Sequence, residues 1–254
     1  MQQTIEQLTD LRLYGVIEAW HDQRHQASYQ DLSFDERFAL LIEREYGRRQ
    51  LYRQQRRLKQ AQLFIAASLD EVDFQVKRGL QKSLFLQWLQ GQWLTEHLNL
   101  ILVGPTGTGK TFLSCVLAHH LCLQGASVRY FKTADLLAQL RLAKADGSFP
   151  KFRKRLASVE LLLLDEWLRD PLTPADARDL LDVLDERYRR TSCLFASQFP
   201  VNQWHQQIHD PTLADAILDR IVHDSLRLTL HGESMRKLTS SLPSKSETAS
   251  QGIH

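Results

Sequence analysis

The pattern of hydrophobic and polar positions changes near residue 98. Through residues 1–65, apolar residues recur at helical spacing without strand-like alternation. From residue 98 onward, short apolar runs alternate with helical patterns, which is typical of a parallel sheet with helices between its strands. The runs predict five strands, at 98–103, 128–131, 161–165, 193–197 and 226–230. We therefore expect an α/β fold with a five-stranded parallel sheet, preceded by a small all-helical N-terminal domain.

Local patterns add detail to some of these elements. The strand at 226–230 alternates apolar and polar residues, so it is expected at a sheet edge or half covered. A long helix is predicted to begin at Ser33, because Ser33 and Glu36 have the spacing of a capping box. Residues 68–97 are expected to form further helices. The expected organisation is a helical domain over 1–67, a nucleotide-binding domain over 68–238 and a disordered polar tail over 239–254.

A glycine-rich segment separates the first predicted strand from the helix after it. Residues 104–111 read GPTGTGKT and meet the pattern G-x-x-x-x-G-K-[ST] at each fixed position. Glycines let backbone N–H groups converge above the helix N-terminus, where the helix dipole also favours an anion. The lysine supplies a point charge for the β- and γ-phosphates of ATP, and the threonine hydroxyl suits Mg²⁺. The predicted ATP-binding residues are Gly104, Pro105, Thr106, Gly107, Thr108, Gly109, Lys110, Thr111 and Phe112.

Polar residues follow two further predicted strands. Four leucines at 161–164 run into Asp165 and Glu166, at the strand end where open α/β sheets bind ligands. We expect Asp165 and Thr111 to hold Mg²⁺ and Glu166 to polarise an attacking water, so the pair predicts ATP hydrolysis. Gln198 would lie beside the γ-phosphate if strands 161–165 and 193–197 are neighbours. The alternatives are solvated acids at a strand end and a plain turn glutamine.

Composition limits the class of protein. Hydrophobic residues make up 43% and charged residues 24%, as in ordinary soluble proteins. The first residues lack a signal-peptide pattern, and no apolar run approaches the ~18 residues of a membrane span. Cys115, Cys122 and Cys193 lie in apolar contexts without C-x-x-C spacing, which predicts buried thiols in a reducing compartment. We expect a cytoplasmic protein.

Charge is distributed unevenly along the chain, although the net charge is only +2. Residues 1–45 hold nine acidic residues and four arginines, whereas residues 46–90 hold nine basic and three acidic residues. A stripe within 47–60 and a cluster at 149–155 could neutralise DNA phosphates without reading bases. Either could instead be a solvated helix face or a subunit interface. The predicted DNA contacts are Arg48, Arg49, Arg53, Arg56, Arg57, Lys151, Arg153, Lys154 and Arg155.

Four segments together resemble one known family. GPTGTGKT, LLLLDEW, SQFPVNQWH and DPTLADAILDRIVHDSLRLTLHGESMRK are similar to those of the IstB-like transposition helper ATPases, relatives of the DnaC helicase loaders within the AAA+ class. The similarity covers nearly the whole chain and implies an AAA+ P-loop ATPase domain over 68–238. The chain departs from the family at one place. Family members commonly have a glycine shortly after the acidic pair, where this chain has Trp167-Leu168.

The resemblance also assigns roles to two arginines. Arg220, in ILDRIVH, resembles the arginine finger that reaches the γ-phosphate of a neighbouring subunit. Arg236, in GESMRK, resembles the sensor-two arginine that acts on the subunit's own nucleotide. A planar cation suits the dispersed charge of phosphoryl transfer, so both roles are chemically reasonable. The residues expected to serve catalysis are Lys110, Glu166, Gln198, Arg220 and Arg236.

The function implied is that of an ATP-dependent transposition helper. It would form a homo-oligomer on duplex DNA with weak sequence preference and recruit or regulate a transposase, with ATP hydrolysis resetting the assembly. The alternative is a replicative helicase loader of the DnaC type, which shares the same ATP site. A small-molecule kinase would need an acceptor pocket that the sequence does not indicate.

Overall fold

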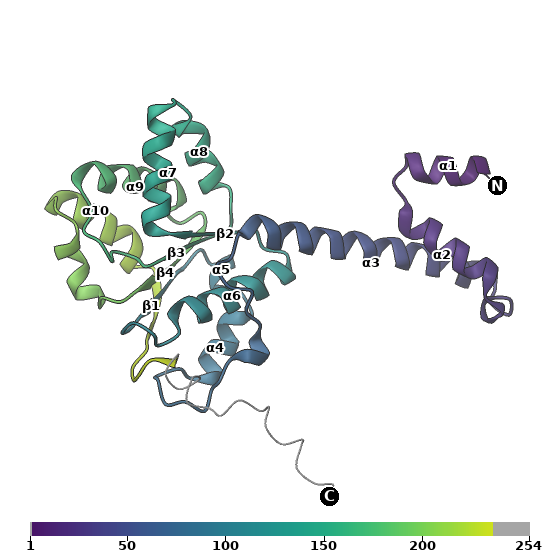
Figure 1. Cartoon of the computed structure of the whole chain (residues 1–254), viewed down its shortest axis with the longest axis horizontal. Coiled ribbons are helices and arrows are strands. Elements are labelled where there is room, and N and C mark those ends of the chain that lie inside the picture. Colours follow the sequence, from purple (N-terminus) through teal and green to yellow (C-terminus); the bar gives the residue numbers. More distant parts are fainter. Residues whose placement is uncertain (1, 236–254) are drawn as a thin grey trace, which may run out of the picture. The chain divides into compact units, whose positions relative to one another are not determined.

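The computed structural model describes residues 2–235 and divides into two compact units (Figure 1). The first is formed by residues 1–59 and the second by the residues from 60 onward. The domain boundary expected after residue 67 stays a prediction, and the expected tail at 239–254 lies outside the described residues. The helices of the first unit are α1 (Gln2–Asp10), α2 (Tyr14–His25), a 3-10 turn (Ala27–Tyr29) and α3 (Phe34–Ala61), whose last residues enter the second unit.

Helix α3 begins at the predicted capping box. The Ser33 N–H donates to Glu36 Oε2 at 2.8 Å, and the Glu36 N–H donates to Ser33 Oγ at 3.3 Å. Hydrogen bonds from the Ser33 hydroxyl and N–H lower the pKa of Glu36. Helices α2 and α3 approach closely at Gly15, whose N–H donates to Glu45 Oε2 at 2.6 Å. A Cβ at Gly15 would lie 2.7 Å from Glu45 Cα, so a side chain there would force the helices apart.

The second unit contains a five-stranded parallel sheet in the order β2-β3-β4-β1-β5. Every predicted strand is confirmed to within one residue at each end. The position of the last strand at a sheet edge is confirmed as well, because β5 has only β1 beside it. The strands are β1 (Asn99–Val103), β2 (Val128–Lys132), β3 (Leu161–Asp165), β4 (Ser192–Ser197) and β5 (Ser225–Thr229).

Helices cover both faces of this sheet (Figure 1). Helix α6 (Lys110–Gln124) packs on one face, with α4 (Lys82–Leu89) against it. The other face is covered by α7 (Thr133–Ala145), α8 (Phe149–Ala157), α9 (Pro174–Arg187) and α10 (Pro211–Val222). Leucine-rich β1 and β3 are buried on both sides for this reason, which explains their unbroken apolar runs.

The helices expected throughout residues 68–97 form only in part. The structure has a 3-10 turn at Leu69–Glu71, then α4 and α5 (Gln92–Thr95), and residues 72–81 contain no helix. The backbone there follows the segment after β5 instead, because the His231 N–H donates to the Arg78 carbonyl at 2.9 Å. Gly79 has φ +83° and lies so close to the Thr229 carbonyl that a Cβ would approach it to 2.6 Å.

Two expectations from composition are consistent with the structure. Within residues 2–235, no helix has the length and apolarity needed to cross a membrane. Cys115, Cys122 and Cys193 are buried free thiols, as predicted. Burial raises the pKa of Cys115 to about 11, so this thiol stays protonated and unreactive near neutral pH.

Candidate nucleotide-binding and hydrolysis site

The phosphate loop follows the last residue of β1 and ends where α6 begins at Lys110. Gly107 and Gly109 have φ +89° and +95°, a region that residues with a Cβ avoid. Gly109 is the N-cap residue of α6, so its left-handed conformation joins the loop directly to the first turn of the helix. The sequence GPTGTGKT therefore forms the strand, glycine turn and helix that an anion site requires.

The segment after β5 packs against the outside of this loop. The Met235 N–H donates to the Gly107 carbonyl at 2.9 Å. A Cβ on Gly107 would lie 2.3 Å from Ser234 Oγ, and one on Gly104 would lie 2.5 Å from the Leu230 carbonyl oxygen. Glycine is thus required at both positions by close backbone approach as well as by loop geometry.

Lys110 points its ammonium group back into the loop. Its Nζ donates to the carbonyls of Gly104 at 2.6 Å and Pro105 at 2.8 Å. Burial lowers the pKa of Lys110, and the nearby Asp165 opposes that shift. The two carbonyls supply no negative charge of their own, so the ammonium remains available to an anionic phosphate.

Asp165, at the end of β3, is buried in a network of hydrogen bonds. Thr111 Oγ1 donates to its Oδ2 at 2.8 Å, the Tyr130 hydroxyl donates to the same atom at 3.0 Å, and the Glu166 N–H donates to Oδ1 at 2.9 Å. Burial and the adjacent Asp165 raise the pKa of Tyr130, which keeps its hydroxyl a donor. A carboxylate and a hydroxyl in direct contact are hard oxygen ligands, so Thr111 and Asp165 fit Mg²⁺.

Glu166 lies in a turn with φ +53° and is paired with two cations. Its carboxylate contacts the guanidinium of Arg169 and lies 3.6 Å from Lys132 Nζ. The Trp167-Leu168 pair that departs from the family pattern is completely buried. The Trp167 ring packs 4.7 Å from Phe195, so the pair anchors the turn that carries Glu166 and Arg169 in the core.

A pocket of about 380 Å³ brings the predicted residues together. Gln198 lies beside the loop and accepts a hydrogen bond from the Thr106 hydroxyl at 3.2 Å. This position follows from the pairing of β3 with β4, the condition under which Gln198 was predicted to lie there. The predicted residues in the pocket wall are Thr106, Gly107, Gly109, Lys110, Thr111, Phe112, Asp165, Glu166 and Gln198.

Several residues of this pocket were not predicted. Lys132 and Arg169 face Glu166, while Phe64 and Ile65 add an apolar side. Tyr130 supports Asp165 from the neighbouring strand β2. Tyr130 reaches Asp165 through the register of β2 against β3, which is a tertiary property. The other four have no motif that would single them out among ordinary basic and apolar residues.

Arg220 lies away from this pocket. It is on α10, where its guanidinium contacts Asp185 and donates to the Ala216 carbonyl at 2.7 Å. The Asn99 side chain donates to the Arg220 carbonyl at 3.1 Å, and Asn99 opens β1, whereas the phosphate loop follows the end of that strand. Arg236, the other predicted catalytic arginine, lies outside the described residues.

The predicted DNA contacts divide into paired and unpaired side chains. Arg48 contacts Glu18, Arg49 lies 2.6 Å from Glu45, and Arg153 lies 2.6 Å from Glu186. The Arg155 guanidinium lies 4.9 Å from the Phe152 ring centroid. Among residues 2–235, no ion pair involves Arg53, Arg56, Arg57, Lys151, Lys154 or Arg155.

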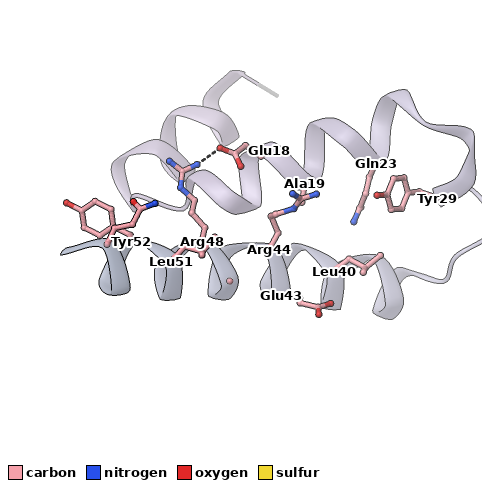
Figure 2. Close-up of a pocket in the computed structure, with 12 residues that line it drawn as sticks. Glu18, Ala19, Gln23, Tyr29, Leu40, Glu43, Arg44, Arg48, Leu51 and Tyr52 are labelled. Carbon is pink, nitrogen blue, oxygen red and sulfur yellow. Dashed lines mark hydrogen bonds and ion pairs between the residues drawn. The ribbon is translucent and has the colours of Figure 1, made fainter. Parts of the chain in front are cut away.

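The first unit has a larger groove, of about 680 Å³, between α2 and α3 (Figure 2). The Arg48–Glu18 ion pair bridges the two helices there, while Leu40 and Tyr29 line the groove farther along. The groove mixes apolar, acidic and basic side chains and contains no phosphate-binding loop. It therefore belongs to helix packing in this unit rather than to the nucleotide chemistry.

Comparison with known proteins agrees with this geometry. Residues 6–243 match a family described as "IstB-like ATP binding protein". The "Putative insertion sequence ATP-binding protein y4pL" of Sinorhizobium fredii is 39% identical over 234 residues, covering 92% of this chain and 96% of that protein. The "Insertion sequence IS1162 putative ATP-binding protein" of Pseudomonas fluorescens is 41% identical over 200 residues, covering 78% and 87%. The solved structure titled "Crystal Structure of the DnaI" is similar in fold, with a TM-score of 0.57 and 19% identity over 66% of this chain and 95% of that one.

Proposed function

Because this chain belongs to the family of IstB-like ATP binding proteins, we propose that it is a transposition helper that assembles on duplex DNA with ATP. It is an AAA+ P-loop ATPase, and its relatives are proteins of insertion sequences. In this proposal the assembled protein recruits or regulates a transposase. Hydrolysis of ATP then resets the assembly.

The chain's own residues supply the parts of an ATP hydrolysis site. The glycine loop and Lys110 bind the phosphates, Glu166 orients and accepts a proton from the attacking water, and Gln198 assists from the neighbouring strand. Thr111 and Asp165 would hold Mg²⁺, which supplies charge neutralisation on the β- and γ-phosphate oxygens when bound. In this reaction water is the only acceptor that the γ-phosphoryl group requires.

One observation supports the DNA part of the proposal: the arginines of α3 are not all used inside the protein. Acidic residues pair with Arg48 and Arg49, but Arg53, Arg56 and Arg57 have no ion pair within the described residues. Unpaired arginines on an exposed helix can release counterions from a phosphate backbone without the cost of breaking an existing ion pair. On α8 the same reasoning favours Lys151, Lys154 and Arg155 over Arg153.

The test is ATP-dependent retention of the protein on duplex DNA at moderate salt. The double variant Arg53→Glu/Arg56→Glu is expected to lose retention, and each phosphate contact removed should lower the log–log salt slope by about 0.9. Arg37→Glu is the matched control, because Arg37 is an exposed arginine on the same helix outside the predicted stripe. Equal loss in both variants, or wild-type protein that is not retained with ATP, would contradict the proposal.

Arg220 is proposed to act on the nucleotide of a neighbouring subunit. Arg220 lies beside the start of β1, whereas the phosphate loop of the same subunit follows the end of that strand, and this supports a role in trans. Assembly would have to release Arg220 from Asp185. Arg220→Ala should lower turnover by about 10³-fold or more, as for arginine fingers in general. Mixing Arg220→Ala with Glu166→Gln subunits should restore part of the activity. No restoration, with both variants still co-assembling, would show that Arg220 does not act in trans.

The helicase-loader alternative is separated by the same preparations. A loader would stay small with ATP and duplex DNA and would gain mass only when a replicative helicase is added. The similarity of fold to DnaI does not favour it, because that similarity concerns the fold alone. Light scattering of Glu166→Gln with ATP, with and without duplex DNA, therefore distinguishes the two functions.

A further inference from the structure

A buried arginine lies directly behind the phosphate loop. Arg78 is only 3% exposed, and its Nη1 donates to the Thr108 carbonyl at 3.1 Å. Its Nη2 donates to the Asp73 carbonyl at 3.2 Å. A Cβ placed on Gly109 would meet Arg78 Nη1 at 2.6 Å, so the guanidinium is in direct contact with the loop. Its position depends on the non-helical segment 72–81 that the sequence did not predict.

The charge of Arg78 has no anionic partner within the described residues. It forms no ion pair, and its buried Nε has no hydrogen-bond partner among residues 2–235. Burial lowers the pKa of Arg78, with only a partial opposing effect from Asp73. Burying a cation is costly unless an opposite charge compensates it, and residues 2–235 supply no such charge in an ion pair with Arg78.

Arg187 is a second buried arginine, and its hydrogen bonding differs from that of Arg78. Arg187 is equally buried, but its nitrogens donate to the carbonyls of Leu156, Val159 and Ser192 and to the Cys193 thiol. All of its nitrogens are thus satisfied, at the beginning of β4, the opposite end of that strand from Gln198 and the nucleotide pocket. Arg78 has fewer hydrogen bonds and lies directly behind the phosphate loop, against Thr108 and Gly109.

We propose that Arg78 is a positioning residue for the nucleotide, whose polyphosphate supplies the missing counter-charge through the loop. Its bond to the Thr108 carbonyl holds the loop backbone, and its fixed charge adds to that of Lys110. If the guanidinium lies about 8 Å from a bound phosphate, Coulomb's law at an effective dielectric constant of about 20 corresponds to roughly thirtyfold in affinity. The contribution should grow with the number of phosphates and be greatest for ATP.

Arg78 and the phosphate loop are both hydrogen-bonded to the segment after β5. The Arg78 carbonyl accepts the His231 N–H, and Met235 binds the loop at Gly107. Arg78 and the 230–235 segment therefore contact the loop together. Nucleotide that neutralises Arg78 would stabilise this whole arrangement, which predicts a large rise in the unfolding temperature on ATP binding.

The experiment compares Arg78→Gln, Arg78→Lys and the control Arg187→Lys, all in the Glu166→Gln background so that ATP is not consumed. Titration calorimetry would measure the affinities for ATP, ADP and AMP without DNA. We expect Arg78→Gln to lose about tenfold or more for ATP, less for ADP and least for AMP. Arg78→Lys should stay within about threefold of the parent, because the nearby polyphosphate favours the charged form of the lysine. Arg187→Lys should lower the unfolding temperature and leave the three affinities unchanged.

Three results would overturn the inference. One is an equal loss for ATP, ADP and AMP in Arg78→Gln, which a merely structural role predicts. Another is a tenfold loss in Arg78→Lys, which also decides the question if Arg78→Gln does not fold. The third is unchanged ATP affinity in Arg78→Gln. The inference rests on nucleotide binding alone, so it can fail while DNA assembly is confirmed, and the reverse also holds.

Discussion

Replacing Gly107 by alanine tests whether the segment after β5 holds the phosphate loop. The new Cβ would lie 2.3 Å from Ser234 Oγ, 2.7 Å from its Cβ and 3.0 Å from its Cα. Because the last contact is with backbone, rotation of the serine side chain cannot relieve the clash completely. The segment must therefore move away from the loop.

The magnitude has two parts. A residue with a Cβ at φ +89° carries about 1–2 kcal/mol of backbone strain. Moving Ser234 would also break the bond from the Met235 N–H to the Gly107 carbonyl, a net loss of about 1 kcal/mol. The sum of about 2–3 kcal/mol corresponds to roughly 30- to 150-fold in ATP affinity if the loop must be rebuilt before ATP binds.

Gly147→Ala is the matched control for this prediction. Gly147 has φ +75° in the turn between α7 and α8, and nothing lies within 4 Å of the Cβ position. This variant should lose only the strain part in urea unfolding and keep its ATP affinity. In Gly107→Ala, adding Ser234→Gly removes two of the three contacts and should recover part of the affinity. No recovery, or an equal affinity loss in Gly147→Ala, would refute the reasoning.

Three further predictions concern the hydrolysis site and the α7–α9 contact. Tyr130→Phe removes one donor to Asp165, a loss of about 1 kcal/mol, so half-maximal turnover should need about fivefold more Mg²⁺, while the unfolding temperature changes little. Glu166→Gln should keep ATP affinity, measured by calorimetry, and lose at least about 100-fold in turnover. Hydrogen bonds from Arg141 lower the pKa of Asp176 in the folded protein. The contribution of this pair to the free energy of unfolding is therefore present above the unfolded pKa of about 3.9 and is lost as pH falls through the lower folded pKa. Arg141→Ala should therefore show a flatter loss of unfolding temperature below about pH 4 than the parent, and an equally steep loss would contradict the assignment.

Much of the fold could be predicted because its signals are local. Residues buried on both faces of a sheet read as unbroken apolar runs, so β1 and β3 were evident from composition over five residues each. The capping box at Ser33 works through bonds that span only three residues. Helix α6 ends at Gly125, whose left-handed conformation is a local stop signal of the kind glycine provides.

The phosphate loop and the acidic pair are also local features, each formed within one strand end and the turn after it. Residues missed by sequence reasoning lie where separate segments meet. Tyr130 reaches Asp165 only because β2 pairs with β3 in a particular register. The expectation of helices throughout 68–97 failed because residues near Gly79 bind the backbone after β5, which no pattern within the segment reveals.

The sequence by itself thus determined the strands, the phosphate loop and the residues that bear the hydrolysis chemistry, since these depend on side chains a few positions apart. Only the tertiary structure decided which cations are free. It pairs Arg48 and Arg49 with acids. Within the part of the chain that the structure describes, it leaves Arg53 without an ion pair on α3 and buries Arg78 beside the loop without a counter-charge. The physical reason is that the free energy of a charge depends on burial and on partners distant in sequence, which only folding brings within reach.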